Sequence, residues 1–381
     1  MPDVIVVGGG LVGSTAAYEL VRAGLNVTLV DRDDRGQATF AGAGILSPGT
    51  GRRHDEYGSR FAHDASDYYA TLLPQIEEDG GGDTGYGKVP VMVVAGEGDS
   101  SADFAHAREE ILRFQGDHLA KSPMKDLTAQ EAKSLFPALG HVEGALLDED
   151  GARVDGNEFR GAIRRAATGR GLKVVNDGVD RLSINQGRVN GVVLRGTTLP
   201  CDVVVLATGA WTSQFQDSLG LQECIVPMKG QICHLGWNSG PTTNWSVVVG
   251  LRDHYILPRS SGRVVVGATR EKDSGLTTEL TAGGCQEVLG EAVRLAPGLR
   301  AATIREWRVG LRPVSIDGHP ILGESPALKG CFLATGHGAG GLLLGPWSAH
   351  LVAKEILEAE EEPRLGQYRP TRFATLSGGH N

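Results

Sequence analysis

The order of apolar and polar residues predicts strands that alternate with helices along much of the chain. Short apolar, β-branched runs at 4–7, 27–30 and 203–206 are typical of strands buried on both faces of a parallel sheet. Further strands are predicted at 89–95, 172–175, 188–194 and 331–334, and helices at 14–22, 62–73, 103–114, 157–168 and 346–357. This alternation predicts an α/β fold.

A second pattern begins near Ile225, where short strands follow one another without helices between them. Strands are expected at 231–235, 246–249, 254–258 and 263–266, followed by a helix at 284–295. Such a run predicts an antiparallel sheet with flanking helices, inserted between segments of the α/β domain. The acidic residues 360–362 are expected to lie at a solvated end.

A glycine-rich turn joins the first predicted strand to the first predicted helix. Gly8, Gly10 and Gly13 form a G-x-G-x-x-G motif, and Asp31 ends the second strand. In such a unit the first glycine allows the tight turn, the second lets a pyrophosphate approach the backbone, and the third lets helix and strand pack closely. The helix amino terminus attracts phosphate, and the carboxylate accepts ribose hydroxyls. The unit predicts a dinucleotide site for FAD or NAD.

The position of this unit at the start of the chain favours FAD. The segment 37–46 that follows is rich in small residues, which would let a ligand lie against the backbone, although a flexible glycine–alanine loop is the alternative interpretation. Glycine is abundant overall, with 55 of 381 residues.

Composition narrows the function classes. The net charge of −9 argues against nucleic-acid binding and against an anionic membrane surface. Five scattered cysteines without a C-x-x-C pair argue against a disulfide framework and a metal site. We see no signal-peptide pattern and no apolar stretch long enough to span a membrane, so we expect a soluble, cytoplasmic protein.

Taken in order, several segments resemble the glycine oxidase/D-amino acid oxidase family of FAD-dependent amine oxidoreductases, and glycine oxidase most of all. The matching segments are 4–31, 41–46, 203–211, 226–230, 255–259, 262–269, 310–313 and 336–337. The resemblance implies a Rossmann-like FAD-binding domain of the glutathione-reductase type with an inserted α+β antiparallel-sheet substrate domain. It implies that residues 1–80, 145–215 and 308–381 form the first domain, and 81–144 and 216–307 the second.

The resemblance also implies the residues that bind FAD without a covalent link. With the glycines of the motif, these are Leu11, Val12, Asp31, Arg32, Thr39, Ala43, Gly44, Ile45, Val179, His337, Gly338, Ala339, Gly340, Gly341, Leu342 and Leu343. The family's carboxylate-binding arginine falls on Arg312, and its active-site tyrosine on Tyr255.

These two residues suit an amino acid substrate. A guanidinium binds a carboxylate through two parallel hydrogen bonds and keeps its charge when desolvated, and a tyrosine hydroxyl would add a third contact. A surface ion pair for Arg312 and a core position for Tyr255 are the alternatives. The family's hydride transfer from a neutral amine to flavin N5 needs no protein base, so we expect His337 to pack against the flavin rather than act as one.

One departure from the family concerns the substrate wall. Ala339 stands where glycine oxidase carries a second basic residue, and Ile45 and Arg270 stand where it carries methionine. The smaller wall fits a D-amino acid, or a glycine with a large N-substituent that is cleaved to glyoxylate and an amine. O2 is the expected electron acceptor, a partner protein is the alternative, and a homo-oligomer is possible.

Overall fold

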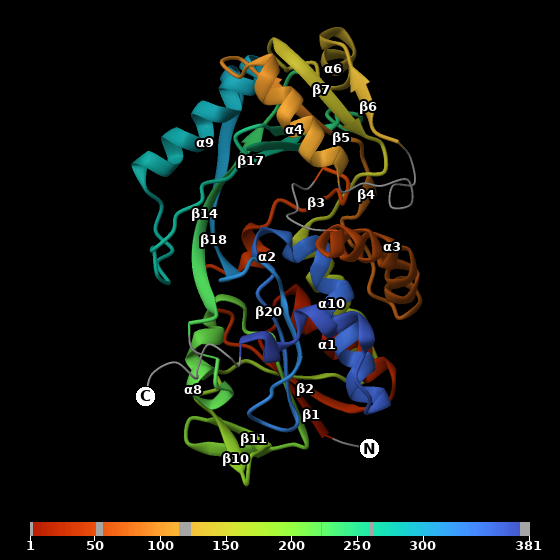
Figure 1. Cartoon of the computed structure of the whole chain (residues 1–381), viewed down its shortest axis with the longest axis vertical. Helices are drawn as coiled ribbons and strands as arrows, with labels where there is room; N and C mark the ends of the chain where they lie inside the picture. The colour runs from red at the N-terminus through yellow and green to blue at the C-terminus, as the bar shows by residue number, and fades with distance from the viewer. Residues whose placement is uncertain (1–2, 51–55, 114–122, 222, 260–261, 374–381) are drawn as a thin grey trace.

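Two large β-sheets organise the molecule. The computed structural model describes residues 3–50, 56–113, 123–221, 223–259 and 262–373. Within them a six-stranded sheet and an eight-stranded sheet lie toward opposite ends of the long axis (Figure 1).

The six-stranded sheet has the order β19-β20-β13-β1-β2-β9 and is parallel except for β19. Its strands are β1 (Asp3–Val7), β2 (Asn26–Val30), β9 (Lys173–Val175), β13 (Val203–Leu206), β19 (Ile321–Glu324) and β20 (Cys331–Thr335). Val4 and Val6 join the core on one face of this sheet, and Ile5 and Val7 join the core on the other. Burial on both faces explains the unbroken apolar runs in the sequence.

Helices cover one face of this sheet. They are α1 (Leu11–Arg22), α3 (Glu56–Glu78), α7 (Gly156–Gly169) and α10 (Gly341–Glu358), and α1 packs against both α7 and α10. The short helix α2 (Ala38–Ala41) packs mainly against β18 (Thr303–Ser315) of the other large sheet. Gly13 is needed for the approach of α1 to β1, because a Cβ added there would lie 1.9 Å from the carbonyl oxygen of Gly8. Gly8 itself has a φ of +96°, a conformation that favours glycine.

The eight-stranded sheet has the order β18-β14-β17-β16-β15-β5-β7-β6 and is antiparallel except for the β15–β5 pair. Its strands are β5 (Val91–Gly96), β6 (Lys125–Leu127), β7 (Val142–Asp148), β14 (Ile225–Gly236), β15 (Val247–Gly250), β16 (Tyr255–Pro258), β17 (Arg263–Gly267) and β18 (Thr303–Ser315). Helices α4 (Ser101–Arg113), α6 (Ala129–Leu135) and α9 (Ala282–Leu295) flank it. The long strands β14 and β18 run along one side of the molecule and link its two halves (Figure 1).

Shorter elements complete the described chain. One small sheet contains β10 (Arg181–Asn185), β11 (Arg188–Leu194) and β12 (Thr197–Pro200), and another contains β3 (Ile45–Leu46), β8 (Ala152–Arg153) and β4 (Gly87–Lys88). The remaining helices are α8 (Gln216–Leu219) and the 3-10 turns η1 (Gly209–Phe215), η2 (Pro297–Ala301), η3 (Gly338–Gly340) and η4 (Pro363–Tyr368).

The structure differs from the sequence-based expectation in several elements. The helix expected at 62–73 is the much longer α3, which continues through Pro74. Strand β18 was not predicted, and it crosses the expected domain boundary between residues 307 and 308, as β7 crosses the one between 144 and 145. The expectation of a solvated acidic end is wrong for Glu362, which is buried and ion-paired with Lys354 and Arg364; Arg364 lowers the pKa of this carboxyl to about 2.

No helix in the described ranges is long and apolar enough to cross a membrane.

Candidate active site

A single cavity of about 1000 Å³ reaches from the glycine-rich turn to the eight-stranded sheet. Of the predicted site residues, all except Gly13 line it: Gly8, Gly10, Leu11, Val12, Asp31, Arg32, Thr39, Ala43, Gly44, Ile45, Val179, Tyr255, Arg312, His337, Gly338, Ala339, Gly340, Gly341, Leu342 and Leu343. Gly13 lies behind the turn, where it allows the close approach of α1 to Gly8. Residues separated by more than three hundred positions therefore meet at one site.

The turn between β1 and α1 forms one end of the cavity. The backbone N–H of Leu11 donates to Oγ1 of Thr39 at 3.0 Å, which fixes the segment after β2 against the start of the helix. Gly10 has no Cβ, so its backbone is open to a pyrophosphate group in the cavity. The free N–H groups and dipole at the start of α1 would attract phosphate there.

Asp31 directly follows β2, at the position where a carboxylate is expected to accept hydrogen bonds from the ribose hydroxyls. Its side chain has a partner that the sequence did not reveal. Nη2 of Arg164 lies 2.7 Å from Oδ2 of Asp31 and also donates to the carbonyl oxygen of Gly9. Arg164 comes from α7, more than 130 residues away, so no local pattern announces it. We infer that it holds the Asp31 carboxylate in place beside the glycine-rich turn.

These residues fit an FAD molecule. The turn leaves backbone open for a pyrophosphate, Asp31 offers a carboxylate to a ribose, and the cavity continues past the start of α10. His337 adds a buried ring nitrogen, Nε2, that has no hydrogen-bond partner among the described residues. An unpaired buried nitrogen costs free energy, and a bound ligand would relieve that cost.

At the other end of the cavity lies Arg312, on β18. Its Nη1 donates to the carbonyl oxygen of Thr269 at 2.9 Å, and its guanidinium lies flat against Gly230, where an added Cβ would come within 2.5 Å of it. Desolvation lowers the pKa of Arg312, but the ordinary value is so high that the group stays charged. The guanidinium keeps further N–H donors for an anion.

Tyr255 begins β16 and lines the same end of the cavity. Its hydroxyl lies beside Gly267, where an added Cβ would come within 2.7 Å of the oxygen. Burial raises the pKa of Tyr255 to about 12, against the opposing effect of Arg312 and Arg270. The hydroxyl is therefore protonated at neutral pH and able to donate a hydrogen bond to an anion.

The part of the cavity wall that packs against β18 is built from small residues. Gly338, Ala339 and Gly340 form η3, and α10 starts at Gly341. Gly338 has a φ of +53°, and an added Cβ there would meet no atom within 4 Å, so the wall is open at this point. Among the residues described, no group of three or more His, Cys, Asp and Glu side chains could hold a metal ion.

Burial lowers the pKa of His337 from 6.5 to about 4, so the ring is neutral at neutral pH. The pKa of this ring is lower in the folded state than in the unfolded state, so the unfolded chain takes up the proton first as the pH falls. The free energy of unfolding is therefore unaffected by this group above about pH 6.5 and decreases as the pH falls toward about 4. We expect a His337→Asn variant to lack this loss. As the pH falls from about 6.5 to about 4, the free energy of unfolding of the wild type should fall by roughly 3 kcal/mol relative to that of the variant. Urea unfolding at a series of pH values measures this difference. A constant difference would contradict the assignment.

The fold and the relatives of this chain define an FAD-dependent amine or amino acid oxidase. The chain belongs to the DAO family of FAD dependent oxidoreductases, which it matches over residues 3–355. This membership confirms the predicted family, the cofactor FAD and the predicted fold class.

Individual relatives agree with this assignment. The chain is 36% identical to the uncharacterized oxidoreductase YurR of Bacillus subtilis (strain 168), over 97% of this chain and 99% of that one. It is 31% identical to the glycine oxidase of Pseudomonas aeruginosa, over 92% and 93% of the two chains. The solved structure of iminodiacetate oxidase from Chelativorans sp. BNC1 is 36% identical and has a TM-score of 0.90, covering 96% of this chain and 98% of that one.

Proposed function

We propose that this enzyme oxidises the C–N bond of a glycine that carries a substituent on its nitrogen, and releases glyoxylate and the free amine. The observation that carries the proposal is Arg312, a guanidinium with free donors at the end of the cavity opposite the dinucleotide unit. It would bind the glycine carboxylate through two parallel hydrogen bonds, and the Tyr255 hydroxyl would donate a third.

Binding of the carboxylate would fix the direction of the substrate Cα–H bond, and such orientation supplies much of the rate in reactions of this type. When bound, FAD supplies a two-electron acceptor for the hydride of that bond. The substrate nitrogen then loses its proton to give an imine, which water hydrolyses. Neither Arg312 nor Tyr255 needs to act as a base, and the lowered pKa of His337 makes it a weak one.

The small wall at Gly338, Ala339 and Gly340 supports the presence of a substituent on the substrate. A wall without a large side chain leaves room that free glycine would not fill. The likeness to an iminodiacetate oxidase also supports the proposal, because iminodiacetate is a glycine with a carboxymethyl group on its nitrogen. The same open wall favours a second candidate substrate, a D-amino acid, whose side chain on Cα would occupy that room.

The proposal is tested by steady-state kinetics with glycine, sarcosine, a panel of D-amino acids and N-carboxymethyl amines of increasing size. We expect kcat/KM for the N-substituted glycines to exceed that for glycine by about tenfold or more, the scale on which filling a pocket discriminates substrates. A clear preference for glycine would contradict the proposal, and a preference for a D-amino acid would select the second candidate.

We further propose O2 as the electron acceptor. Anaerobic reduction with substrate, followed by rapid mixing with air, measures the reoxidation directly. Reoxidation as fast as turnover supports an oxidase, and much slower reoxidation would show that electrons pass to a partner.

A further inference from the structure

A second arginine, Arg270, lines the substrate end of the cavity together with Arg312 and Tyr255. It follows Thr269, whose carbonyl oxygen accepts a hydrogen bond from Arg312. One short backbone segment after β17 therefore carries both the carbonyl oxygen that binds Arg312 and the side chain of Arg270. The two charges are close enough that Arg270 helps to lower the pKa of Arg312.

The acidic residue next in the chain does not neutralise Arg270. The Glu271 carboxylate accepts hydrogen bonds from Gln231 at 2.6 Å and from Oγ1 of Thr269 at 2.7 Å, and its other oxygen lies 2.8 Å from Nζ of Lys229. These contacts engage both oxygens of the partly buried Glu271 carboxylate.

Arg270 makes its main contact with Asp253, which also lines the cavity. Nη1 of Arg270 donates to the carbonyl oxygen of Asp253 at 3.2 Å, while Nη2 lies 3.7 Å from Oδ2, beyond hydrogen-bond reach. The Asp253 carboxylate is half exposed and offsets the charge of Arg270 only in part. A guanidinium has several donors, so this contact leaves donors free for a ligand.

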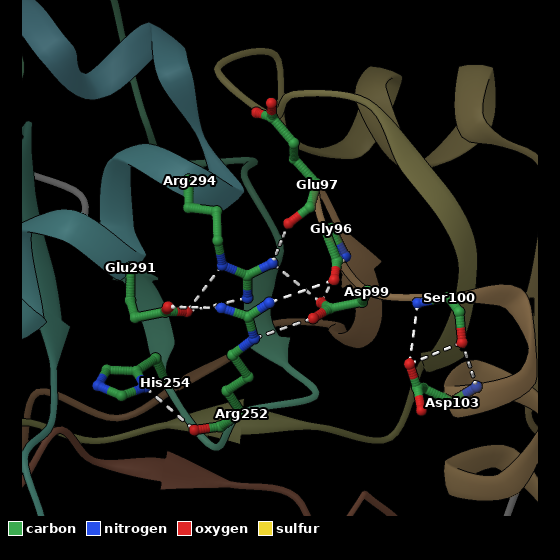
Figure 2. A network of polar contacts seen from close by, with 10 residues as sticks. Gly96, Glu97, Asp99, Ser100, Asp103, Arg252, His254, Glu291 and Arg294 are labelled. Atoms are coloured by element: carbon green, nitrogen blue, oxygen red, sulfur yellow. Dashed lines mark hydrogen bonds and ion pairs between the residues drawn. The ribbon is translucent and has the colours of Figure 1, made fainter.

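The backbone of Asp253 is fixed because the turn that carries it is held by ion pairs of the preceding residue and by hydrogen bonds within the turn. Arg252 donates to Oδ1 of Asp99 at 3.0 Å and to Glu291 at 3.3 Å, and Arg294 donates to both of the same carboxylates (Figure 2). Within the turn, the N–H of Gly250 donates to the carbonyl of His254, and that of Asp253 donates to the carbonyl of Gly250. This network fixes the backbone oxygen that positions Arg270.

Arg312 and the segment after β17 thus place two guanidiniums close together, where one substrate carboxylate needs only one. Among the described residues that line the cavity, α4 adds Glu110 and Arg113, one of each sign, so this pair brings no net charge. We propose that Arg270 binds a second acidic group on the substrate, so that the enzyme prefers N-substituted glycines whose substituent ends in a carboxylate. This inference rests on the proposed function, and it assigns Arg270 as the residue that selects among those substrates.

Two amines of matched chemistry test it. Iminodiacetate and sarcosine share a glycine unit and a secondary amine, and differ in whether the substituent carries a carboxylate. We expect Arg270→Gln to lower kcat/KM for iminodiacetate by about 10- to 100-fold, mainly through KM, as for loss of a hydrogen bond to a charged group. For sarcosine the change should stay within about twofold. Arg300→Gln, at an exposed position in η2 whose chain neighbours do not line the cavity, removes the same charge and serves as the control.

A binding measurement separates this inference from the proposed function. Glutarate and butyrate have the shapes of iminodiacetate and sarcosine but lack the amine, so they bind without being oxidised. Their Kd values follow from the change they cause in the flavin absorbance of the holoenzyme. We expect Arg270→Gln to raise the Kd of glutarate by about 10- to 100-fold and to change the Kd of butyrate by no more than about twofold.

Equal effects on both acids, or none on either, would overturn the role of Arg270 even if both amines are oxidised. If neither amine reduces the flavin of the wild-type enzyme, the proposed function fails, while the pair of acids still measures the second anion site. Flavin content and melting temperature of the variant show whether it is folded.

Discussion

Replacing Arg312 with alanine is expected to raise KM for the amino acid substrate several hundredfold. The guanidinium lies at the end of the cavity on β18, with one hydrogen bond to Thr269 and further donors free for a carboxylate. Truncation would leave the substrate carboxylate unpaired in a desolvated site, a loss of about 3–5 kcal/mol. Steady-state kinetics with the best substrate measures it, and flavin content should not change.

Two further variants sharpen this test. Arg312→Lys keeps the charge but loses the planar fork, so it should recover only part of the affinity. Arg305→Ala removes an exposed arginine from the same strand, outside the cavity, and should leave KM unchanged. An unchanged KM in Arg312→Ala would remove Arg312 from the substrate site.

Replacing Gly10 with valine is expected to yield folded protein that has lost its yellow flavin. Gly10 lines the cavity at the turn before α1, and an added Cβ would lie 3.3 Å from Oγ1 of Thr39, a tight contact that a shift of this one side chain by a few tenths of an ångström would relieve. The branched side chain would instead fill the space that a pyrophosphate needs against the backbone. We expect the affinity for FAD to fall by about 100-fold or more, equal to about 3 kcal/mol.

The ratio of flavin absorbance to protein concentration measures this loss, and circular dichroism shows whether the fold is intact. Gly290→Ala is a suitable control, because Gly290 lies on the exposed side of α9 and an added Cβ meets nothing within 4 Å. A Gly10→Val variant that retains a full complement of FAD would contradict the position given to the pyrophosphate.

Sequence patterns predicted elements best where the deciding interactions are local. Val203–Leu206 is apolar throughout because it is buried on both sides, and the structure places it beside β1. The pattern failed for β18, whose residues 303–308 are mostly polar and exposed or half-buried. That strand is held by its long pairing with β14, an interaction that no local window contains.

The candidate site divides in the same way. Family resemblance pointed to Arg312 and Tyr255, and the cavity brings them together as expected. It did not point to Arg164, whose contact with Asp31 depends on how α7 packs against α1. Nor did any pattern indicate that Asp253 would meet Arg270, since that contact depends on a turn anchored through Asp99.

The sequence by itself determined the cofactor class, because Gly8, Gly10, Gly13 and Asp31 belong to one continuous strand–helix–strand unit whose contacts are short in sequence. Only the tertiary structure decided what faces that unit. Arg312, Tyr255, Arg270 and the Ala339 wall come from separate elements, and the pairing of β14, β16, β17 and β18 brings three of them to one end of a shared cavity. Spacing along the chain carries no information about such convergence, because it depends on strand pairings between residues far apart in the sequence.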